Sequence, residues 1–88
     1  MKWTKEDLRA ALLVIFAQHA QLKVELTHAT QIVGDLGIDS LGVMEVVADI
    51  EDKFGVNIPD EALPELSTIG DVTVAIEKRL GDAGRLAG

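Results

Sequence analysis

Cysteine is absent from this chain of 88 residues, which excludes disulfides, a thiolate nucleophile and a cysteine-ligated metal. The two histidines, His19 and His28, are too few and too isolated for a histidine-rich metal site. No apolar run approaches the roughly 20 residues of a membrane span, and the N-terminal stretch MKWTKEDLRA lacks the apolar core of a signal peptide. We therefore expect a single-domain, monomeric protein of the cytoplasm that does not insert into a membrane.

Basic residues are scarce: eight Lys and Arg stand against fifteen Asp and Glu, for a net charge of −7. This balance argues against binding to nucleic acid or to an anionic membrane surface. Between Asp35 and Asp71 there are ten acids and one base, Lys53, so this segment carries −9 and the remainder +2. Such a segment suits a basic protein partner, although a merely solvated surface would have the same composition.

Apolar residues at helical spacing predict three main helices. The first should begin near Lys5, after a possible Thr4 cap, and run to about Ala20 with the apolar stripe Leu8, Leu12, Ile15, Phe16 and then His19. The second should span Ser40 to Phe54 and stop at Gly55. The third should start near Thr68 and end at Gly81, with the stripe Val72, Ile76 and Leu80.

Two connections complete the expected fold. Residues 21–39 form a long loop, which we expect to be pinned by the apolar residues Val24, Leu26, Ile32, Leu36 and Ile38. Asp60 to Leu63 should form a short helical turn limited by Pro64. The prediction is an all-α, small four-helix bundle of three main helices and one short helix. Residues 1–80 form the domain, and residues 81–88 are expected to be a flexible tail.

The second predicted helix has apolar residues on both of its faces. Its core arc holds Val43, Val46, Val47, Ile50 and Phe54. The opposite arc should be polar, yet Leu41, Met44 and Ala48 lie there among the acids Glu45, Glu51 and Asp52. A small apolar patch with an acidic rim is typical of a protein docking surface, because charge orients the encounter and apolar contact holds it.

Ser40, at the start of this helix, has three interpretations. With Asp39 it is a good helix cap, which is a purely structural role. As a nucleophile it would need a base and an orienting acid. The stretch IDSL is close to the GDSL signature of a serine esterase family. However, both histidines lie upstream of Ser40, and the chain is small for a substrate cleft. Third, a separate enzyme can supply the base, and a helix N-terminus favours an attached phosphate. The third interpretation fits best.

The segment DLGIDSLGVMEVVADIEDKFGVNIPDE resembles the acyl carrier proteins, and the match spans about residues 5–80. In that family an Asp-Ser-Leu at the start of the second helix carries 4′-phosphopantetheine, derived from coenzyme A. The resemblance implies that Ser40 is the attachment site, with Asp39 and Leu41 completing the motif. It also implies a carrier rather than an enzyme, modified by a phosphopantetheinyl transferase.

The same resemblance assigns further residues. The partner face falls on Leu41, Met44, Glu45, Ala48, Glu51 and Asp52. Its implied partners are acyl-transferring, ketosynthase-type and reductase-type enzymes with basic docking patches. Four residues are expected to line an acyl pocket: Val47, Ile58, Leu63 and Ile69.

Two positions depart from the family pattern. Gly42 stands where many fatty-acid carriers have an acid, and Pro64 interrupts the helix that forms one wall of the acyl pocket in the family. Both lean toward a specialised discrete carrier, and fatty-acid and polyketide biosynthesis stay open as pathways. The alternative outside the family is an acidic helical adaptor that binds a basic protein and is never modified.

Overall fold

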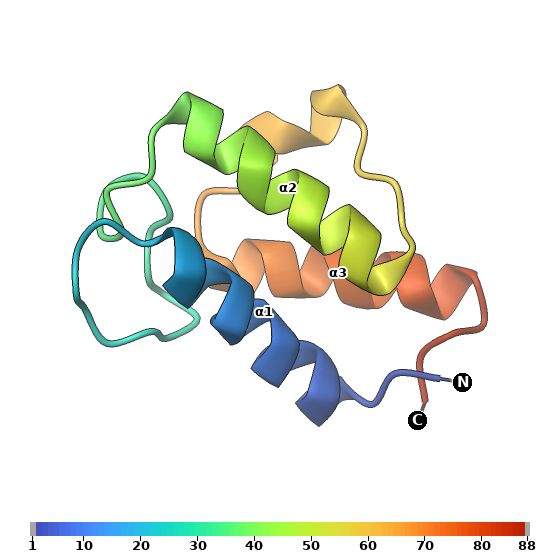
Figure 1. Ribbon diagram of the computed structural model, residues 1–88. Coiled ribbons are helices and arrows are strands. Elements are labelled where there is room, and N and C mark those ends of the chain that lie inside the picture. Colours follow the sequence, from blue (N-terminus) through green and yellow to red (C-terminus); the bar gives the residue numbers. More distant parts are fainter. Residues whose placement is uncertain (1, 88) are drawn as a thin grey trace.

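The computed structural model describes residues 2–87, so Met1 and Gly88, the outer ends of the expected domain and tail, lie outside it. Helix α1 spans Lys5–His19, α2 spans Ser40–Phe54 and α3 spans Ile69–Asp82. A short 3-10 helix, η1, spans Asp60–Glu65. Figure 1 shows α2 crossing above α1 and α3, with η1 beside α2. The all-α prediction of three main helices and one short helix is confirmed.

Side chains cap each main helix at its N-terminus. Thr4 Oγ1 accepts a hydrogen bond from the Asp7 N–H at 3.0 Å, as expected for the start of α1. At α3, Thr68 Oγ1 accepts from the Asp71 N–H, and the Asp71 carboxylate accepts from the Thr68 N–H, both at 3.1 Å. Hydrogen bonds from the Thr68 N–H and then the Ser67 N–H hold the pKa of Asp71 below its ordinary value.

The C-terminal ends of the helices correct two expectations. Gly55 ends α2 as predicted, in the left-handed conformation with φ of 64°. Gly81 does not end α3, because it lies inside the helix, which continues to Asp82. Pro64 does not end the short helix either: η1 runs to Glu65, and the Leu66 N–H bonds to the Leu63 carbonyl at 3.0 Å. The 3-10 pattern therefore continues past a residue that donates no hydrogen bond of its own.

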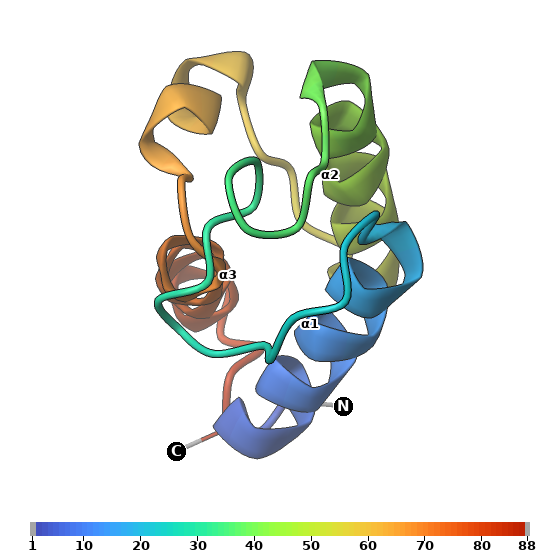
Figure 2. The same cartoon turned by 90° about the vertical axis from the view of Figure 1, so that its left-hand side faces the viewer.

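The long segment between α1 and α2 crosses the end of the bundle (Figure 2). Of its five expected anchors, Ile32, Leu36 and Ile38 are buried, Leu26 is half-buried and Val24 is exposed. Backbone hydrogen bonds also tie the segment to the start of α3. The Ile32 N–H donates to the Ser67 carbonyl, and the Ile69 N–H donates to the Thr30 carbonyl, each at 3.0 Å. The segment is thus held in place by α3 as well as by the core.

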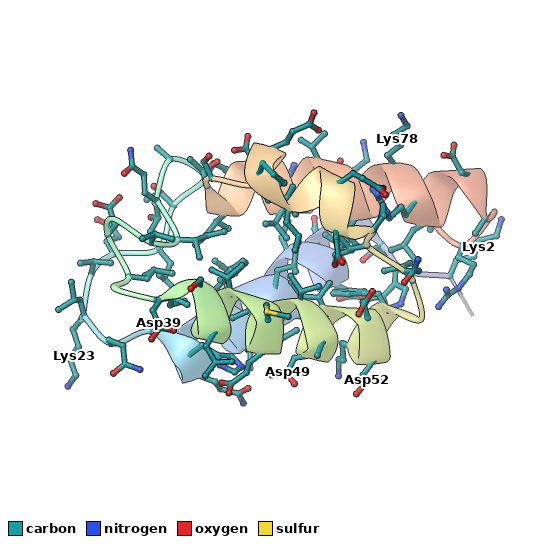
Figure 3. The ribbon with its side chains drawn as sticks, turned by 90° about the horizontal axis from the view of Figure 1, so that it is seen from above. Lys2, Lys23, Asp39, Asp49, Asp52 and Lys78 are labelled. Carbon is teal, nitrogen blue, oxygen red and sulfur yellow. The ribbon has the colours of Figure 1, made fainter. Side chains whose placement is uncertain are left out.

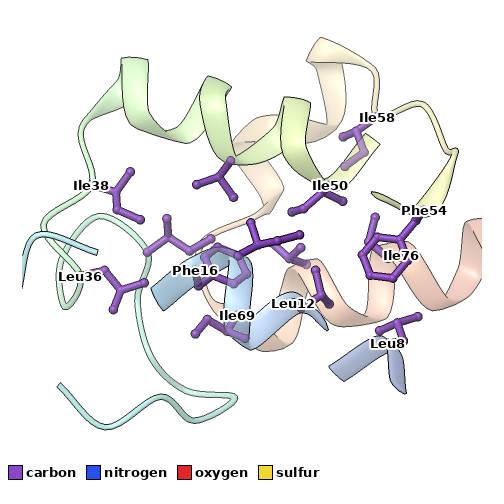
Figure 4. Close-up of a cluster of buried hydrophobic side chains, with 14 of the residues drawn as sticks. Leu8, Leu12, Phe16, Leu36, Ile38, Ile50, Phe54, Ile58, Ile69 and Ile76 are labelled. Atoms are coloured by element: carbon purple, nitrogen blue, oxygen red, sulfur yellow. The ribbon is translucent and has the colours of Figure 1, made fainter. Parts of the chain in front are cut away.

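The core fills the space between the three main helices (Figure 4). It contains every apolar residue of the two predicted stripes of α1 and α3, and from α2 it contains Val46, Ile50 and Phe54. Val43 and Val47, which we also placed on the core arc of α2, are half-buried at its edge. Val47 lies in the middle of α2 and lines a small cavity with Ile58 and Leu66, which lie on either side of η1 in the sequence.

The C-terminal segment, expected to be flexible, lies against the N-terminal segment. The Trp3 N–H donates to the Arg85 carbonyl at 2.8 Å, and the Ala87 N–H donates to the Trp3 carbonyl at 2.7 Å. Arg85 Nη1 also donates to the Gly55 carbonyl at 2.9 Å, and the Trp3 ring packs 4.6 Å from the ring of Phe54. Residues 85–87 and Trp3 therefore close the end of the bundle at which α2 finishes. Within residues 2–87, no helix has the length and apolar character that crossing a bilayer requires.

Candidate functional site

Ser40 is the first residue of α2, and its side chain is exposed. The helix is capped by Asp39, whose Oδ1 accepts a hydrogen bond from the Gly42 N–H at 2.7 Å. Either residue was a candidate for the cap from the sequence. Because the cap is made by Asp39, the hydroxyl of Ser40 is not needed to stabilise the helix start.

Gly42 allows the loop before α2 to pack closely against its first turn. A Cβ atom at position 42 would lie 2.7 Å from Ile38 Cγ2 and 3.2 Å from Asp39 Oδ1. Ile38 is buried, so it has little room to move away. The glycine that departs from the family pattern thus has a local structural reason: it makes room for a core residue and for the cap.

The exposed arc of α2 is the one expected from its periodicity. Leu41 is 66% exposed and Met44 is 61% exposed, so both apolar side chains face solvent. Glu45, Ala48 and Asp52 are exposed with them. Figure 3 shows Asp39, Asp49 and Asp52 along α2, with Lys2 and Lys78 at the other end of the molecule from Asp39.

Glu51 differs from the other acids of this arc. It is half-buried, and its Oε2 accepts a hydrogen bond from the Ile58 N–H at 2.8 Å. This bond fixes the segment that leads from α2 into η1. Glu51 therefore has a structural task beside any role on the partner face.

Asp49 belongs to the acidic surface although the sequence reasoning did not assign it. Its Oδ2 lies 2.6 Å from His19 Nε2, and His19 Nδ1 lies 4.0 Å from Glu45 Oε2. His19 therefore joins the end of α1 to the acidic side of α2. The sequence holds a weak signal for this pair, since His19 ends the apolar stripe of α1, but the contact joins residues 30 positions apart.

Neither histidine supports hydrolase chemistry. The imidazole of His19 faces the carboxylates of Asp49 and Glu45. His28 lies in the long segment between α1 and α2. Its carbonyl accepts a hydrogen bond from the Gly70 N–H at the start of α3. A nucleophilic serine needs a base in hydrogen-bond reach, and no hydrogen bond links Ser40 to either ring within residues 2–87. The same residues contain no cluster of three metal-ligating side chains.

The four residues expected to line an acyl pocket are separated in the fold. Val47 and Ile58 line one small apolar cavity of about 10 Å³, which core residues of all three main helices also line. Leu63, half-buried on η1, packs against the core but is not part of that lining. Ile69 lines a different hollow, of about 100 Å³, beside Leu13 and Leu26. The cavity beside Val47 and Ile58 therefore has room for about one water molecule.

Comparison with known proteins supplies independent findings. A family profile described as "Phosphopantetheine attachment site" matches residues 10–81. The meromycolate extension acyl carrier protein of Mycolicibacterium smegmatis is 42% identical over 79 residues, which are 89% of this chain and 80% of that protein. Its counterpart from Mycolicibacterium aurum is 50% identical over 79 residues, covering 89% and 81%.

A solved structure is similar along nearly its whole length. It is the acyl carrier protein of Enterococcus faecalis, a protein of high thermal stability. It aligns with a TM-score of 0.75 and 31% identity, covering 88% of this chain and 99% of that one.

Proposed function

Because this chain belongs to the acyl carrier protein family, we propose that Ser40 is the residue that bears its 4′-phosphopantetheine. Members of the family are carriers rather than enzymes, and they work with biosynthetic enzymes. When attached, the group supplies a thiol that holds acyl groups as thioesters. The assignment to Ser40 depends on one observation above all: an exposed hydroxyl on the first residue of α2, next to a cap made by another side chain.

The residues around Ser40 fit a phosphodiester. The first N–H groups of a helix have no partner within it, and Asp39 uses only that of Gly42. The N–H groups of Ser40 and Leu41 thus remain for phosphate oxygens, where the helix dipole also favours negative charge. In the attachment the serine Oγ forms the new bond to phosphorus, and the bond from phosphorus to the nucleotide half of coenzyme A breaks. A base of the phosphopantetheinyl transferase takes the hydroxyl proton.

The exposed arc of α2 is the proposed docking face for partner enzymes. Leu41, Met44 and Ala48 supply its apolar centre, and Glu45 and Asp52 supply exposed carboxylates. Basic patches on transferases, ketosynthases and reductases would be attracted to these acids before apolar contact is made. Glu51 would contribute charge there while its carboxylate holds the Ile58 N–H.

Shelter for an attached acyl chain is a further part of this proposal. Val47 and Ile58 form the most suitable lining because they share an apolar cavity. A cavity of about 10 Å³ has to widen before it can take even a few methylene groups. Widening is easiest where η1 and the residue that follows it contact the core only through half-buried side chains, those of Ala62, Leu63 and Leu66.

The names of the relatives favour one class of pathway. Both mycobacterial relatives are named for meromycolate extension, which favours the lengthening of fatty acyl chains over polyketide assembly for this carrier as well. Action in the cytoplasm stays a prediction from the sequence.

A mass measurement tests the attachment site. The protein is incubated with coenzyme A and a promiscuous phosphopantetheinyl transferase, and its intact mass is recorded. We expect one phosphopantetheine per chain in the wild type and in Ser67→Ala, which changes the only other serine. Ser40→Ala should gain nothing. A wild type that gains no mass would favour the unmodified adaptor, and a Ser40→Ala variant that gains it would place the group elsewhere.

Loading kinetics test the docking face. Glu45→Lys should slow loading by partner enzymes at low ionic strength, and the deficit should shrink as salt screens the charges. Glu25→Lys, an exposed loop position, changes the net charge equally and serves as the control. Glu51→Lys is a poorer variant, because it also removes the acceptor of the Ile58 N–H. Equal loading rates for the two lysine variants at low salt would show that the face is misplaced.

A further inference from the structure

The small apolar cavity beside Val47 has a rim that is partly open to solvent. Val43 and Val47 of α2 line it together with Leu66, which follows η1, and all three side chains are half-buried. An α-helix turns by about 100° per residue, so Ser40 and Val47 lie at nearly the same angle around α2, with Val43 close by. An acyl group on an arm at Ser40 would therefore reach the cavity along this side of α2, between the two valines and Leu66.

The inner wall of the cavity is dominated by Phe16. Of the described residues that line the cavity, Phe16 is the only aromatic one and the only one from α1. Its side chain is fully buried, and Figure 4 shows its ring at the centre of the core cluster. Val46, Ile50 and Val72 line the same wall and are buried too. Because such a core is close-packed, the ring has little room to turn away from a guest.

We propose that Phe16 sets the depth to which the protein takes up an acyl chain, an inference that rests on attachment at Ser40 and on shelter beside Val47. The rim can open outward, because Leu66 contacts the core only through a half-buried side chain. The inner wall cannot yield in the same way. An acyl chain therefore extends inward from the rim until its terminal methyl group meets the Phe16 ring, and any further methylene groups stay outside.

The consequence is a distinction between acyl groups by length. Short chains are sheltered completely, whereas the outer part of a long chain stays in contact with solvent and accessible to partner enzymes. The depth limit is thus a property of one core side chain rather than of the docking face on α2.

Phe54 is a natural control for Phe16. It is the other phenylalanine of the chain, and it is also fully buried. It packs against Trp3 and is not part of the lining of the cavity. A conservative substitution at either position loosens the core, but only the one at Phe16 enlarges the space available to an acyl chain.

The test compares wild type, Phe16→Leu and Phe54→Leu. Each protein is loaded from acyl-coenzyme A with saturated chains of increasing even length, loading is confirmed by intact mass, and the thermal unfolding midpoint is recorded for each form. In the wild type the midpoint should rise with chain length and then level off. In Phe16→Leu it should level off about one step of the series later, because the substitution leaves a cavity that additional methylene groups can fill. Phe54→Leu should have lower midpoints throughout but level off at the wild-type length.

A second measurement needs no variant. Nuclear magnetic resonance of the wild type, loaded with the longest chain that still raises the midpoint, should show nuclear Overhauser contacts between the terminal methyl group and the ring protons of Phe16. Contacts from this methyl group to other core residues without any to Phe16 would overturn the proposal.

The remaining outcomes separate the depth limit from the proposals on which it rests. If the midpoint of Phe16→Leu levels off at the wild-type length, the depth limit alone is wrong. A wild-type midpoint that does not depend on chain length would overturn the shelter and the depth limit together. A protein that gains no mass contradicts attachment at Ser40, and both further proposals then fail with it.

Discussion

The two ends of α2 differ in how tightly they are held. At the C-terminal end, Phe54 is fully buried against Trp3, and Arg85 bonds to the carbonyl of Gly55. At the N-terminal end, Ser40 and Leu41 are exposed, and one side-chain cap from Asp39 fixes the first turn. One end of the helix therefore contributes to stability, and the other leaves exposed the groups that we propose for partner binding.

This division places the exposed serine on a rigid element. A site on a helix that is anchored at its far end keeps its geometry while its near end stays accessible. Substitutions at the two ends should accordingly have separable effects, on stability at one end and on loading at the other.

The largest effect is expected at the buried end. Phe54→Ala should lower the free energy of unfolding by about 3–5 kcal/mol, because it leaves a cavity beside Trp3. Chemical denaturation monitored by circular dichroism measures the loss. Loading by the transferase, expressed per folded molecule, should match that of the wild type. A larger fall in loading would mean that the two ends are coupled.

At the exposed end, Asp39→Ala should cost about 1 kcal/mol of stability through loss of the helix cap. Asp39→Asn keeps a side-chain acceptor and is the matched control, because asparagine caps helices about as well as aspartate. Thermal unfolding of the three proteins measures the cap. Loading of the asparagine variant then reports the role of the charge beside Ser40, and a stability as low as that of the alanine variant would contradict the capping argument.

A smaller effect is expected for the exposed hydrogen bond that closes the other end. Arg85→Ala should lower stability by about 0.5 kcal/mol, since one exposed hydrogen bond to the Gly55 carbonyl is lost. Lys78→Ala, on the exposed surface of α3, is the comparison. Amide hydrogen exchange at Gly55 and Trp3 should speed up in the arginine variant alone; unchanged exchange would show that the C-terminal segment contributes nothing to this end.

The smallest effect is a pH-dependent change in stability at the N-terminus of α3. This helix is the reference for α2 because an aspartate also takes part in its cap. The N–H groups of Thr68 and Ser67 keep the pKa of Asp71 below its ordinary value. The carboxylate therefore adds stability above the pKa of the unfolded chain, and this contribution is lost as pH falls through the folded-state pKa. Unfolding midpoints of the wild type and Asp71→Ala should thus converge in acid, and a constant difference down to pH 2 would contradict this account.

Local signals in the sequence were sufficient for the helices. Asp39 and Gly55 bracket α2 because a cap and a left-handed glycine act within one turn, and both bounds were predicted. The predicted end of α3 at Gly81 was wrong, because a glycine caps a helix in this way only where the chain turns left-handed. The glycine that does so here is Gly84, with φ of 70°. Ser40 and the exposed arc of α2 were likewise predictable, since both follow from periodicity along one helix.

Contacts between distant residues were not predictable from the same signals. The pairing of Trp3 with residues 85–87 joins the two ends of the chain. The bonds from Glu51 to Ile58 and from His19 to Asp49 depend on how α2 lies against its neighbours. The division of the expected acyl-pocket residues has the same origin, because Ile69 lines a hollow with Leu13 and Val47 lines a different cavity.

The pairing of Trp3 with Leu86 brings both chain ends together, away from the first turn of α2 (Figure 1). A fusion partner, an affinity tag or a surface linker joined at either end would therefore lie at the side of the molecule away from Ser40, and the serine would stay accessible. Two copies joined in tandem would likewise present both serines at the side remote from their shared linker.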